Sequence, residues 1–353
     1  MKIAITADVH ITSQKKNPER YRAFINILDQ LVTLGINDLI IAGDLFDKTC
    51  EHPGELEELI RKSQYEQIKI YIIPGNHDPV LSQGAFTLGN LEYITQLQQM
   101  KITGGTSLLF VPYQSHTYFG EILASCPHTL SPNEWIMVGH GDYLTSSHLK
   151  NTYEDVSYML LSGKDLQVYQ PRKIFLGHIH APYDSSVVHY PGSPCGMDIT
   201  ETGVRSFLVY DTDRKNPERV PVETDIIYLQ ESLVVLPMAD EEDYVRNSLA
   251  NKIARWDLDE KQRKKVRLRV NLQGYSINRE RLLETVTDFL TQKGIVMEEK
   301  PDLSQVKLSN DTTRAEIAML VQQSIVELAP PTGDDEPTTE EYILSAMSQI
   351  YKV

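Results

Sequence analysis

Five short polar clusters contain the side chains of this sequence that could carry chemistry, and each cluster follows an apolar run. Aspartate and histidine dominate the clusters, an asparagine joins them, and no cysteine lies in any of them. Imidazole, carboxylate and amide ligands without thiolate suit a Mn, Fe or Zn ion better than a structural zinc site. In chain order the clusters are Asp8-Val9-His10, Gly43-Asp44, Gly75-Asn76-His77-Asp78, Gly139-His140 and Gly177-His178-Ile179-His180.

Such a ligand set could hold a pair of divalent metal ions. Two ions about 3.5–4 Å apart activate a bridging water and clamp the attacking and leaving oxygens of a phosphate ester. Asp8, Asp44 and a bridging hydroxide do not cancel the charge of two divalent ions, and the surplus attracts phosphate. The residue types therefore predict two-metal phosphoester hydrolysis, with Mn²⁺ as the first choice of ion.

Each cluster taken alone has an ordinary structural explanation, because Asp and Gly are common turn residues after a strand. Five clusters in the same position relative to an apolar run favour a shared function instead. The clusters hold half of the ten histidines, and we expect the other histidines to be structural or to lie at the surface. These other histidines are His52, His116, His128, His148 and His189.

The apolar runs before the clusters are typical of buried strands. They read KIAIT, DLIIA, IKIYIIP, EWIMV and KIFL. Because open α/β sheets bind ligands beyond the carboxyl ends of their strands, the clusters should meet along one rim. A helix should follow the first strand, with Asn17 as N-cap, Pro18 in its first turn and Gly35 just past its end.

Strands and helices alternate to about residue 165, and strands dominate from there to about residue 228. This order predicts an α/β fold: a sandwich of mixed sheets flanked by helices, with its later strands antiparallel. From residue 229 to residue 308 the alternation restarts, with helices expected at 241–255 and 278–293. We expect a separate small α/β module there.

One strand of this module has an apolar face and a basic face. In the run KKVRLRV, valine and leucine alternate with Lys265, Arg267 and Arg269. Two interpretations stay open, a solvated outer face and a surface that contacts the phosphates of DNA.

The segment after the module is predicted to be helical. A capping box at Thr313 and Glu316 should open one helix, and the linker APPTGDDEPTT separates it from a final amphipathic stretch. The apolar face of that stretch could pack on its own chain or bind a partner. It carries Tyr342, Ile343, Met347, Ile350 and Tyr351.

Composition limits the classes of protein that fit. The net charge of −15 argues against a generally basic nucleic-acid coat, although it leaves room for local DNA contacts. Three scattered cysteines fit a reducing cytoplasm, and no apolar run is long enough for a membrane span. The first residues run straight into a strand that carries predicted ligands, so we expect no removable signal.

The motifs D-x-H, G-D, G-N-H-D, G-H and G-H-x-H, in this order, resemble those of the calcineurin-like metallophosphoesterases. The resemblance implies a four-layer sandwich with helices on both outer faces. It also implies that Asp44 bridges two metals. The other implied ligands are Asp8, His10 and His180 for one metal and Asn76, His140 and His178 for the other.

The same resemblance implies catalytic roles for His77 and Asp47. His77 would not bind metal but would face the substrate, as a transition-state stabiliser or as the proton donor to the leaving oxygen. Asp47 would orient His77. An imidazolium hydrogen-bonded to a carboxylate is a workable general acid near neutral pH.

The order of the parts, with the segment GDLFD and the segment PGSP at 191–194, is similar to SbcD-type DNA repair nuclease subunits. This implies a nuclease domain at 1–228, a DNA-contacting cap at 229–308 and a tail at 309–353 that binds an SbcC-type coiled-coil ATPase. It further implies exonuclease and endonuclease activity at DNA ends, and a homodimer. Ile11-Thr12-Ser13 and Pro79 depart from the usual pattern of these subunits.

Two other functions compete with this interpretation. A small-molecule phosphodiesterase or phosphatase of the same superfamily would share the metal site, but it rarely needs two appended domains. A non-catalytic scaffold with this fold is the second alternative, and the presence of every predicted ligand together with His77 argues against it.

Overall fold

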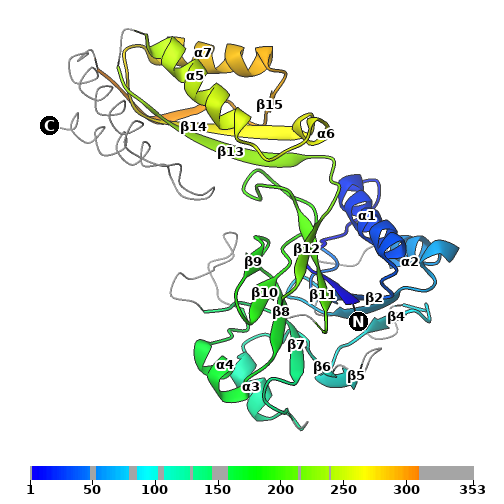
Figure 1. The fold of residues 1–353 in the computed structure, drawn as a ribbon. Helices are drawn as coiled ribbons and strands as arrows, with labels where there is room; N and C mark the ends of the chain where they lie inside the picture. Colours follow the sequence, from blue (N-terminus) through cyan, green and yellow to red (C-terminus); the bar gives the residue numbers. More distant parts are fainter. Residues whose placement is uncertain are drawn as a thin grey trace. The chain divides into compact units, whose positions relative to one another are not determined.

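The computed structural model describes residues 2–47, 53–78, 86–101, 107–127, 130–144, 158–213, 216–237 and 240–309. The chain divides into two compact units, drawn in Figure 1. The first unit comprises Met1–Gly196 and Val204–Asp225, and the second comprises Met197–Gly203 and the chain from Ile226 onward. The predicted partner-binding face of the tail, Tyr342 to Tyr351, lies outside the described residues. In the described ranges, no helix is long and apolar enough to span a membrane.

One six-stranded sheet of the first unit contains the strands that precede the first three polar clusters. Its order is β12-β11-β1-β2-β3-β4, in which β1 to β4 are parallel and β11 and β12 are antiparallel to their neighbours. The strands are β1 (Lys2–Thr6), β2 (Asp38–Ala42), β3 (Lys69–Ile73), β4 (Leu91–Tyr93), β11 (Ser206–Asp211) and β12 (Glu218–Pro221).

The other six-stranded sheet contains the strands that precede the last two clusters. Its order is β5-β6-β7-β8-β10-β9, and β6, β7, β8 and β10 are parallel. The strands are β5 (Gln98–Lys101), β6 (Ser107–Val111), β7 (Trp135–His140), β8 (Lys173–Gly177), β9 (Tyr183–Asp184) and β10 (Val188–Tyr190).

Alternation along the strands builds the core between the two sheets. Ile3 and Ile5 on β1 point into this core, whereas Ala4 between them faces the opposite side of the sheet. Successive side chains of a strand point to opposite faces, so a strand buried on both faces is apolar throughout. The inner core also contains Ile40, Tyr71, Ile73, Leu108, Phe110, Ile136, Val138, Phe175, Leu208 and Tyr210.

Helices cover the outer faces of both sheets. The helices α1 (Pro18–Leu34) and α2 (Pro53–Ile60), with the short helix η1 (Ser63–Tyr65), pack on the first sheet. The helices α3 (Phe119–Ala124) and α4 (Gly163–Tyr169) pack on the second sheet. The predicted sandwich of mixed sheets flanked by helices is therefore confirmed as four layers (Figure 1).

Helix α1 begins and ends where the sequence predicts, but its N-terminal cap differs. Gly35 ends the helix in the left-handed conformation, at φ 63°. The Asn17 side chain makes no capping hydrogen bond. It instead accepts a hydrogen bond from Thr12 Oγ1 and donates one to Glu19 Oε1, so it ties the loop before the helix to the first turn.

The second unit is a small parallel sheet covered by helices on one face. Its strands are β13 (Ile227–Val235), β14 (Val266–Ser276), β15 (Val296–Met297) and β16 (Asp302–Leu308), and β14 pairs with each of the others. The helices α5 (Glu241–Ala254) and α7 (Arg279–Gln292) pack on the apolar face of β14, and α6 (Glu260–Arg263) precedes that strand. The predicted alternation of apolar and basic residues on β14 is present, because its apolar residues are buried and Arg267 and Arg269 lie on the opposite face.

Candidate metal centre

The five clusters lie together at one rim of the first unit. They follow the carboxyl ends of β1, β2, β3, β7 and β8, as their apolar runs predict. A hydrogen bond of 2.9 Å between His140 Nδ1 and the Ala42 carbonyl joins the end of β7 to the end of β2, and so connects the two sheets at this rim. The predicted ligands of both sheets can therefore share one centre.

Glycines in the motifs allow this close approach. A Cβ atom on Gly43 would collide with the imidazole of His140, and one on Gly75 would collide with the carboxylate of Asp44. Gly43 also has φ 89°, a conformation that side chains with a Cβ rarely adopt. These two motif glycines are therefore required by the close approach of a predicted ligand.

Four of the predicted ligands have unusual backbone conformations. Asp8, His10 and Asp44 lie in the left-handed region at φ 52°, 47° and 50°, and His178 has φ 97°. Such conformations cost on the order of 1–3 kcal/mol each, and they persist where the surrounding structure requires them. Four of them in one cluster of ligands are typical of a functional site, because they direct the side chains inward.

The first group that could hold an ion consists of Asp8, His10 and His180. One ligand atom of each lies within 4.8 Å of the others. The Nε2 atoms of His10 and His180 are 3.2 Å apart. Two neutral imidazoles cannot each direct a lone pair at the other without a shared proton or cation between them, so this spacing fits two ligands of one ion.

The second group surrounds the Asn76 amide. Its Oδ1 atom lies 2.8 Å from His140 Nε2 and 3.0 Å from His178 Nδ1. Asp44, His140 and His178 also form a group whose ligand atoms lie within 4.8 Å of one another. The three side chains predicted for the second metal therefore converge.

Asp44 lies between the two groups. Its Oδ2 atom is 3.3 Å from His140 Nε2 and 3.8 Å from His10 Nε2. Its Oδ1 atom accepts a hydrogen bond of 2.9 Å from the His77 backbone N–H, which fixes the orientation of the carboxylate. The Asp44 carboxylate thus lies beside predicted ligands of both metals, as a bridging ligand would.

Two carboxylate oxygens test whether the centre fits metal ions. Asp8 Oδ2 and Asp44 Oδ2 are buried, and neither has a hydrogen-bond partner in the described part of the chain. A buried carboxylate oxygen without a donor is costly, and a cation removes that cost. The oxygen, nitrogen and amide donors around these atoms suit a pair of divalent ions.

Burial controls the protonation of three of the predicted ligands. Burial lowers the pKa of His10 and of His178 to about 3, so both imidazoles are neutral and can offer a lone pair. Burial also raises the pKa of Asp8 to about 6, although the neighbouring His180 and His140 lower it. Two of the predicted histidine ligands are therefore held in the neutral form that binds metal.

Asp44 and His140 form a charge pair in the absence of metal. Burial alone would raise the pKa of the Asp44 carboxyl, but the neighbouring His140 outweighs it and holds that pKa well below its usual range. Burial alone would lower the pKa of His140, but Asp44 outweighs it and raises that pKa to about 9. The Asp44 carboxylate therefore stays ionised, and its negative charge favours binding of a cation at this position.

The predicted catalytic residues lie at the mouth of the centre. The His77 side chain is 21% exposed and that of Asp47 is 32% exposed, whereas the side chain of Asp44 is 1% exposed. His77 Nδ1 lies 3.5 Å from Asp47 Oδ1, and their interaction lowers the pKa of Asp47 to about 2. Asp47 also lies 3.9 Å from His10 Nδ1 and 3.7 Å from Arg20 Nη1. The carboxylate can therefore orient both His77 and a predicted ligand.

Asp142 is a supporting residue that the sequence analysis did not identify. It is buried, its Oδ1 atom lies 3.6 Å from His178 Nε2, and its Oδ2 atom accepts a hydrogen bond of 2.8 Å from the Tyr158 backbone N–H. Because His178 directs its other nitrogen at Asn76, Asp142 can hold the ring in that orientation. Asp142 lies two residues after His140 in the run G-H-G-D, and this closeness to a predicted ligand could have identified it from the sequence.

Asp78 and Arg20 also support the centre. The Asp78 carboxylate accepts hydrogen bonds from the backbone N–H groups of Gly75, at 2.7 Å, and Phe46, at 3.2 Å, so it holds two motif loops together. Arg20 Nη1 donates a hydrogen bond of 2.6 Å to the His10 carbonyl. Asp78 was visible as the last residue of its cluster, whereas nothing in the sequence distinguished Arg20.

The residues predicted to contact DNA lie in the second unit, where the arginines are paired with glutamates. Arg267 Nη1 is 4.0 Å from Glu298 Oε2, and Arg269 Nη2 is 2.9 Å from Glu299 Oε1. Lys265 immediately precedes β14. The basic face is therefore partly neutralised by the segment that follows β15.

Comparison with known proteins agrees with the geometry of the first unit. The family model for calcineurin-like phosphoesterases matches residues 1–211. The DNA double-strand break repair protein Mre11 of Methanococcus maripaludis is 25% identical over 187 residues, which are 50% of this chain and 43% of that protein. The DNA polymerase II small subunit of Methanothermobacter thermautotrophicus is 22% identical over 214 residues, with the same two coverages of 50% and 43%.

A third relative aligns over a shorter part of the chain. The probable cyclic nucleotide phosphodiesterase of Coxiella burnetii is 33% identical over 84 residues, which are 23% of this chain and 33% of that protein. The chain thus aligns with less than half the length of each of these three relatives.

Proposed function

Because the chain belongs to the calcineurin-like phosphoesterase family, we propose that it is a two-metal phosphodiesterase that cleaves DNA. The observation that carries the proposal is the position of Asp44. Its carboxylate lies between two groups of possible ligands, and one of its buried oxygens has no hydrogen-bond donor in the described ranges. Two ions held on either side of one carboxylate could activate water and stabilise both oxygens exchanged in phosphodiester hydrolysis.

The proposed ligand sets are those implied by the motifs. One ion would be held by Asp8, His10 and His180, the other by Asn76, His140 and His178, and Asp44 would contact both. When bound, the ions would supply Lewis acidity and a more acidic water, and Mn²⁺ is our first choice. The supporting carboxylate of Asp142 would keep His178 in its binding orientation.

His77 and Asp47 would handle the proton of the leaving group. Asp47 faces Nδ1 of His77 and can hold a proton on that nitrogen, which leaves Nε2 for the substrate. The partial exposure of the His77 side chain allows a substrate to reach it. An imidazolium at this place could donate its Nε2 proton to the departing oxygen.

DNA is the substrate that we favour for two reasons. Two of the relatives are named as a DNA double-strand break repair protein and as a DNA polymerase subunit. The chain also has a second unit with two arginines on one face of a strand, and arginine is suited to phosphate contacts. We propose that residues 1–228 form the nuclease domain and that residues 229–308 form a DNA-contacting cap.

We also propose that the tail at 309–353 binds a coiled-coil ATPase of the SbcC type, and that the active complex cuts DNA ends as exonuclease and endonuclease. The amphipathic pattern of the tail and the acidic balance of the chain support this. A chain of net charge −15 would gain DNA affinity from a partner that binds DNA itself. Homodimerisation is part of the same proposal.

A small-molecule phosphodiesterase is the second candidate. It is favoured by the similarity to the probable cyclic nucleotide phosphodiesterase. A direct comparison of substrates separates the two functions. Purified chain with Mn²⁺ would be given single-stranded DNA, double-stranded DNA, a cyclic nucleotide and a chromogenic phosphodiester, each with and without a chelator.

The DNA proposal predicts chelator-sensitive cleavage of DNA and little turnover of the cyclic nucleotide. Efficient hydrolysis of the cyclic nucleotide with intact DNA would replace the proposal by the second candidate. Inactivity on all four substrates, in a protein that binds two metals, would contradict both.

A further inference from the structure

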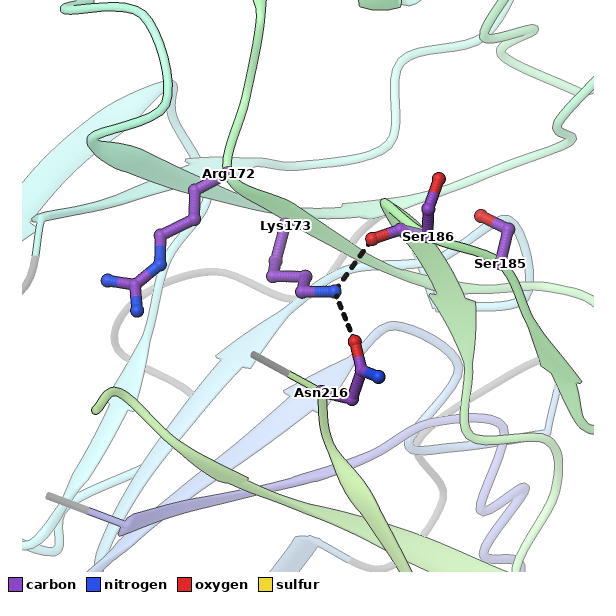
Figure 2. Close-up of a pocket in the computed structure, with 5 residues that line it drawn as sticks. All are labelled: Arg172, Lys173, Ser185, Ser186 and Asn216. Carbon is purple, nitrogen blue, oxygen red and sulfur yellow. Dashed lines mark hydrogen bonds between the residues drawn. The ribbon is translucent and has the colours of Figure 1, made fainter. Parts of the chain in front are cut away.

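A cavity of about 610 Å³ lies at the start of β8, at the other end of that strand from the metal centre. It is lined by Arg172, Lys173, Ser185, Ser186 and Asn216, and Figure 2 shows the ammonium group of Lys173 between Ser186 and Asn216. Lys173 opens β8 and His178 follows its last residue, so a strand of roughly 16 Å separates the two places at about 3.3 Å per residue. The cavity is therefore separate from the metal centre.

The ammonium group of Lys173 is buried among neutral acceptors. The residue is 4% exposed, and its Nζ atom donates to the Ser186 carbonyl at 2.7 Å and to Asn216 Oδ1 at 3.2 Å (Figure 2). The third contact is His189 Nε2, at 3.3 Å. A buried ammonium is stable when a negative charge compensates it, and neutral acceptors do so only in part.

The neighbouring Arg172 adds a second positive charge to the same wall. One of its Nη2 protons goes to the Thr212 carbonyl, and in the described part of the chain no carboxylate forms an ion pair with Arg172 or Lys173. Burial and the charge of Arg172 both lower the pKa of the Lys173 amine. The chain has a net charge of −15, so carboxylates are abundant. Arg172 and Lys173 nevertheless make no ion pair with one in the described ranges, which is typical of a site that binds an anion.

The carboxylate that acts on Lys173 is already engaged elsewhere. Asp184 accepts from His189 Nδ1 at 2.7 Å and from Arg219 Nε at 2.7 Å. His189 therefore lies between Asp184 and Lys173, with Nδ1 toward the acid and Nε2 toward the amine. Asp184 raises the pKa of the Lys173 amine, but less than burial and Arg172 lower it, so it offsets the positive charge of the cavity wall only in part.

We propose that this cavity binds the phosphate group of a small molecule. Arg172 offers Nε and Nη1, and Asn216 offers its side-chain amide nitrogen. The three protons of Lys173 are engaged by Ser186, Asn216 and His189, so Lys173 contributes its positive charge. Guanidinium and ammonium groups are the usual partners of phosphate. The volume lies within the range of about 300–1,000 Å³ that is typical of small-molecule sites.

Phosphate binding to the metal-free chain tests the site. The full chain would be treated with a chelator and titrated with inorganic phosphate by isothermal titration calorimetry. We expect a single site in the wild type and at least about tenfold weaker binding in Arg172→Gln, equivalent to about 1.4 kcal/mol. Hydrolysis of a chromogenic phosphodiester by the metal-loaded Arg172→Gln variant should equal that of the wild type.

Two controls make the result specific. Arg22→Gln removes an exposed arginine of α1, which pairs with Asp225 in the same unit, and should bind phosphate as the wild type does. Asn76→Ala alters the metal centre and should also keep the phosphate site. Ser186→Ala, which keeps the backbone carbonyl that Lys173 uses, supplies a second cavity variant and should weaken binding if its hydroxyl contacts phosphate.

Three outcomes would overturn the inference. One is the absence of phosphate binding to the metal-free wild type at concentrations well above about 1 mM, the weak end of specific affinities. Another is equal phosphate affinity of wild type and Arg172→Gln. Loss of binding in Asn76→Ala with retention in Arg172→Gln would assign the phosphate to the metal centre. Tighter binding of citrate than of phosphate would keep an anion site but reject phosphate as its ligand class.

Discussion

At the scale of single residues, two carboxylates of this centre contact histidines and can orient their rings. Asp47 lies beside His77 at the mouth, and Asp142 lies beside His178 in the interior. Neither acid belongs to any of the three groups of possible ligands in the described residues, which are Asp8, His10 and His180, then His10, Asp44 and His77, and then Asp44, His140 and His178. Their variants therefore separate two effects, the loss of proton transfer and the loss of ligand orientation.

His77→Ser should abolish proton donation without emptying the centre. We expect metal content near that of the wild type and phosphodiester hydrolysis lower by at least about 10²-fold, the low end for loss of a positioned acid. Elemental analysis and a chromogenic assay measure the two quantities. His140→Ala, which removes a predicted ligand, should lose metal as well as activity. A fully active His77→Ser enzyme would exclude His77 as the proton donor, and Asp47 would lose its role with it.

Asp142→Asn should weaken metal binding while leaving the fold intact. Loss of the carboxylate beside a ligand histidine typically costs about 10- to 100-fold in metal affinity. Titration of the metal-free protein with Mn²⁺ measures this change. Asp38→Asn is the matched control, because Asp38 is equally buried but contacts Tyr71 at the start of β2, away from the ligands. Equal Mn²⁺ affinity of the two variants would show that Asp142 does not orient His178.

At the scale of secondary structure, the sequence predicts the ends of strands and helices. It does not predict the contacts between segments that are distant in the sequence. The ends of the strands that carry the clusters are predictable because apolar runs and turn residues are local signals. The neutralisation of Arg267 and Arg269 was not predictable, because it depends on which segment lies beside β14. Asp142 was missed for the same reason. Its partner His178 belongs to a different strand end, and only the tertiary fold brings the two together.

The edge where β9, β10 and β12 meet depends on one ionised acid. Asp184 on β9 accepts hydrogen bonds from His189 on β10 and from Arg219 on β12. Burial alone would raise the pKa of Asp184, but these two donors outweigh it and hold that pKa below its usual range. The stability that the acid contributes is thus fully present above its unfolded-state pKa, and it is lost as the pH falls through the lower folded-state pKa.

Asp184→Asn should therefore destabilise the first unit at pH 7 and less so in acid. Urea unfolding at several pH values, in a Trp256→Phe background that leaves Trp135 as the reporter of the first unit, measures the difference from the parent. We expect the difference to shrink as the pH falls below about 3.9, the ordinary pKa of Asp. Glu134→Gln, at an exposed acid of the same unit, should show no such trend. A difference that is constant with pH would contradict the role of the ionised acid.

The glutamates beside β14 provide a test of the basic face. If this face contacts DNA, the double variant Glu298→Gln/Glu299→Gln should bind DNA more tightly, because it frees Arg267 and Arg269. Each added phosphate contact should steepen the plot of log affinity against log salt by about 0.9. Glu242→Gln/Glu284→Gln makes the same charge change beside Arg281 and is the control. Equal gains in both variants would mean a general charge effect and leave the face as a solvated surface.

At the scale of the whole molecule, the candidate metal centre and the strand proposed to contact DNA belong to different units of the chain. The centre lies entirely within the first unit, and the arginine-bearing strand lies within the second. A net charge of −15 does not suit unaided binding to DNA. The centre itself can therefore be tested with small substrates, independently of the parts that would recognise DNA.

The number of metal ions bound by Asp44→Ala tests the central claim most directly. Asp44 is the carboxylate that lies between the two ligand groups, so its removal should loosen both ions together. The account predicts two ions per chain in the wild type, measured by mass spectrometry after gel filtration, and far fewer in Asp44→Ala, with hydrolysis of a chromogenic phosphodiester lost in parallel. Two ions retained per chain in Asp44→Ala, with hydrolysis intact, would contradict a centre bridged by this residue.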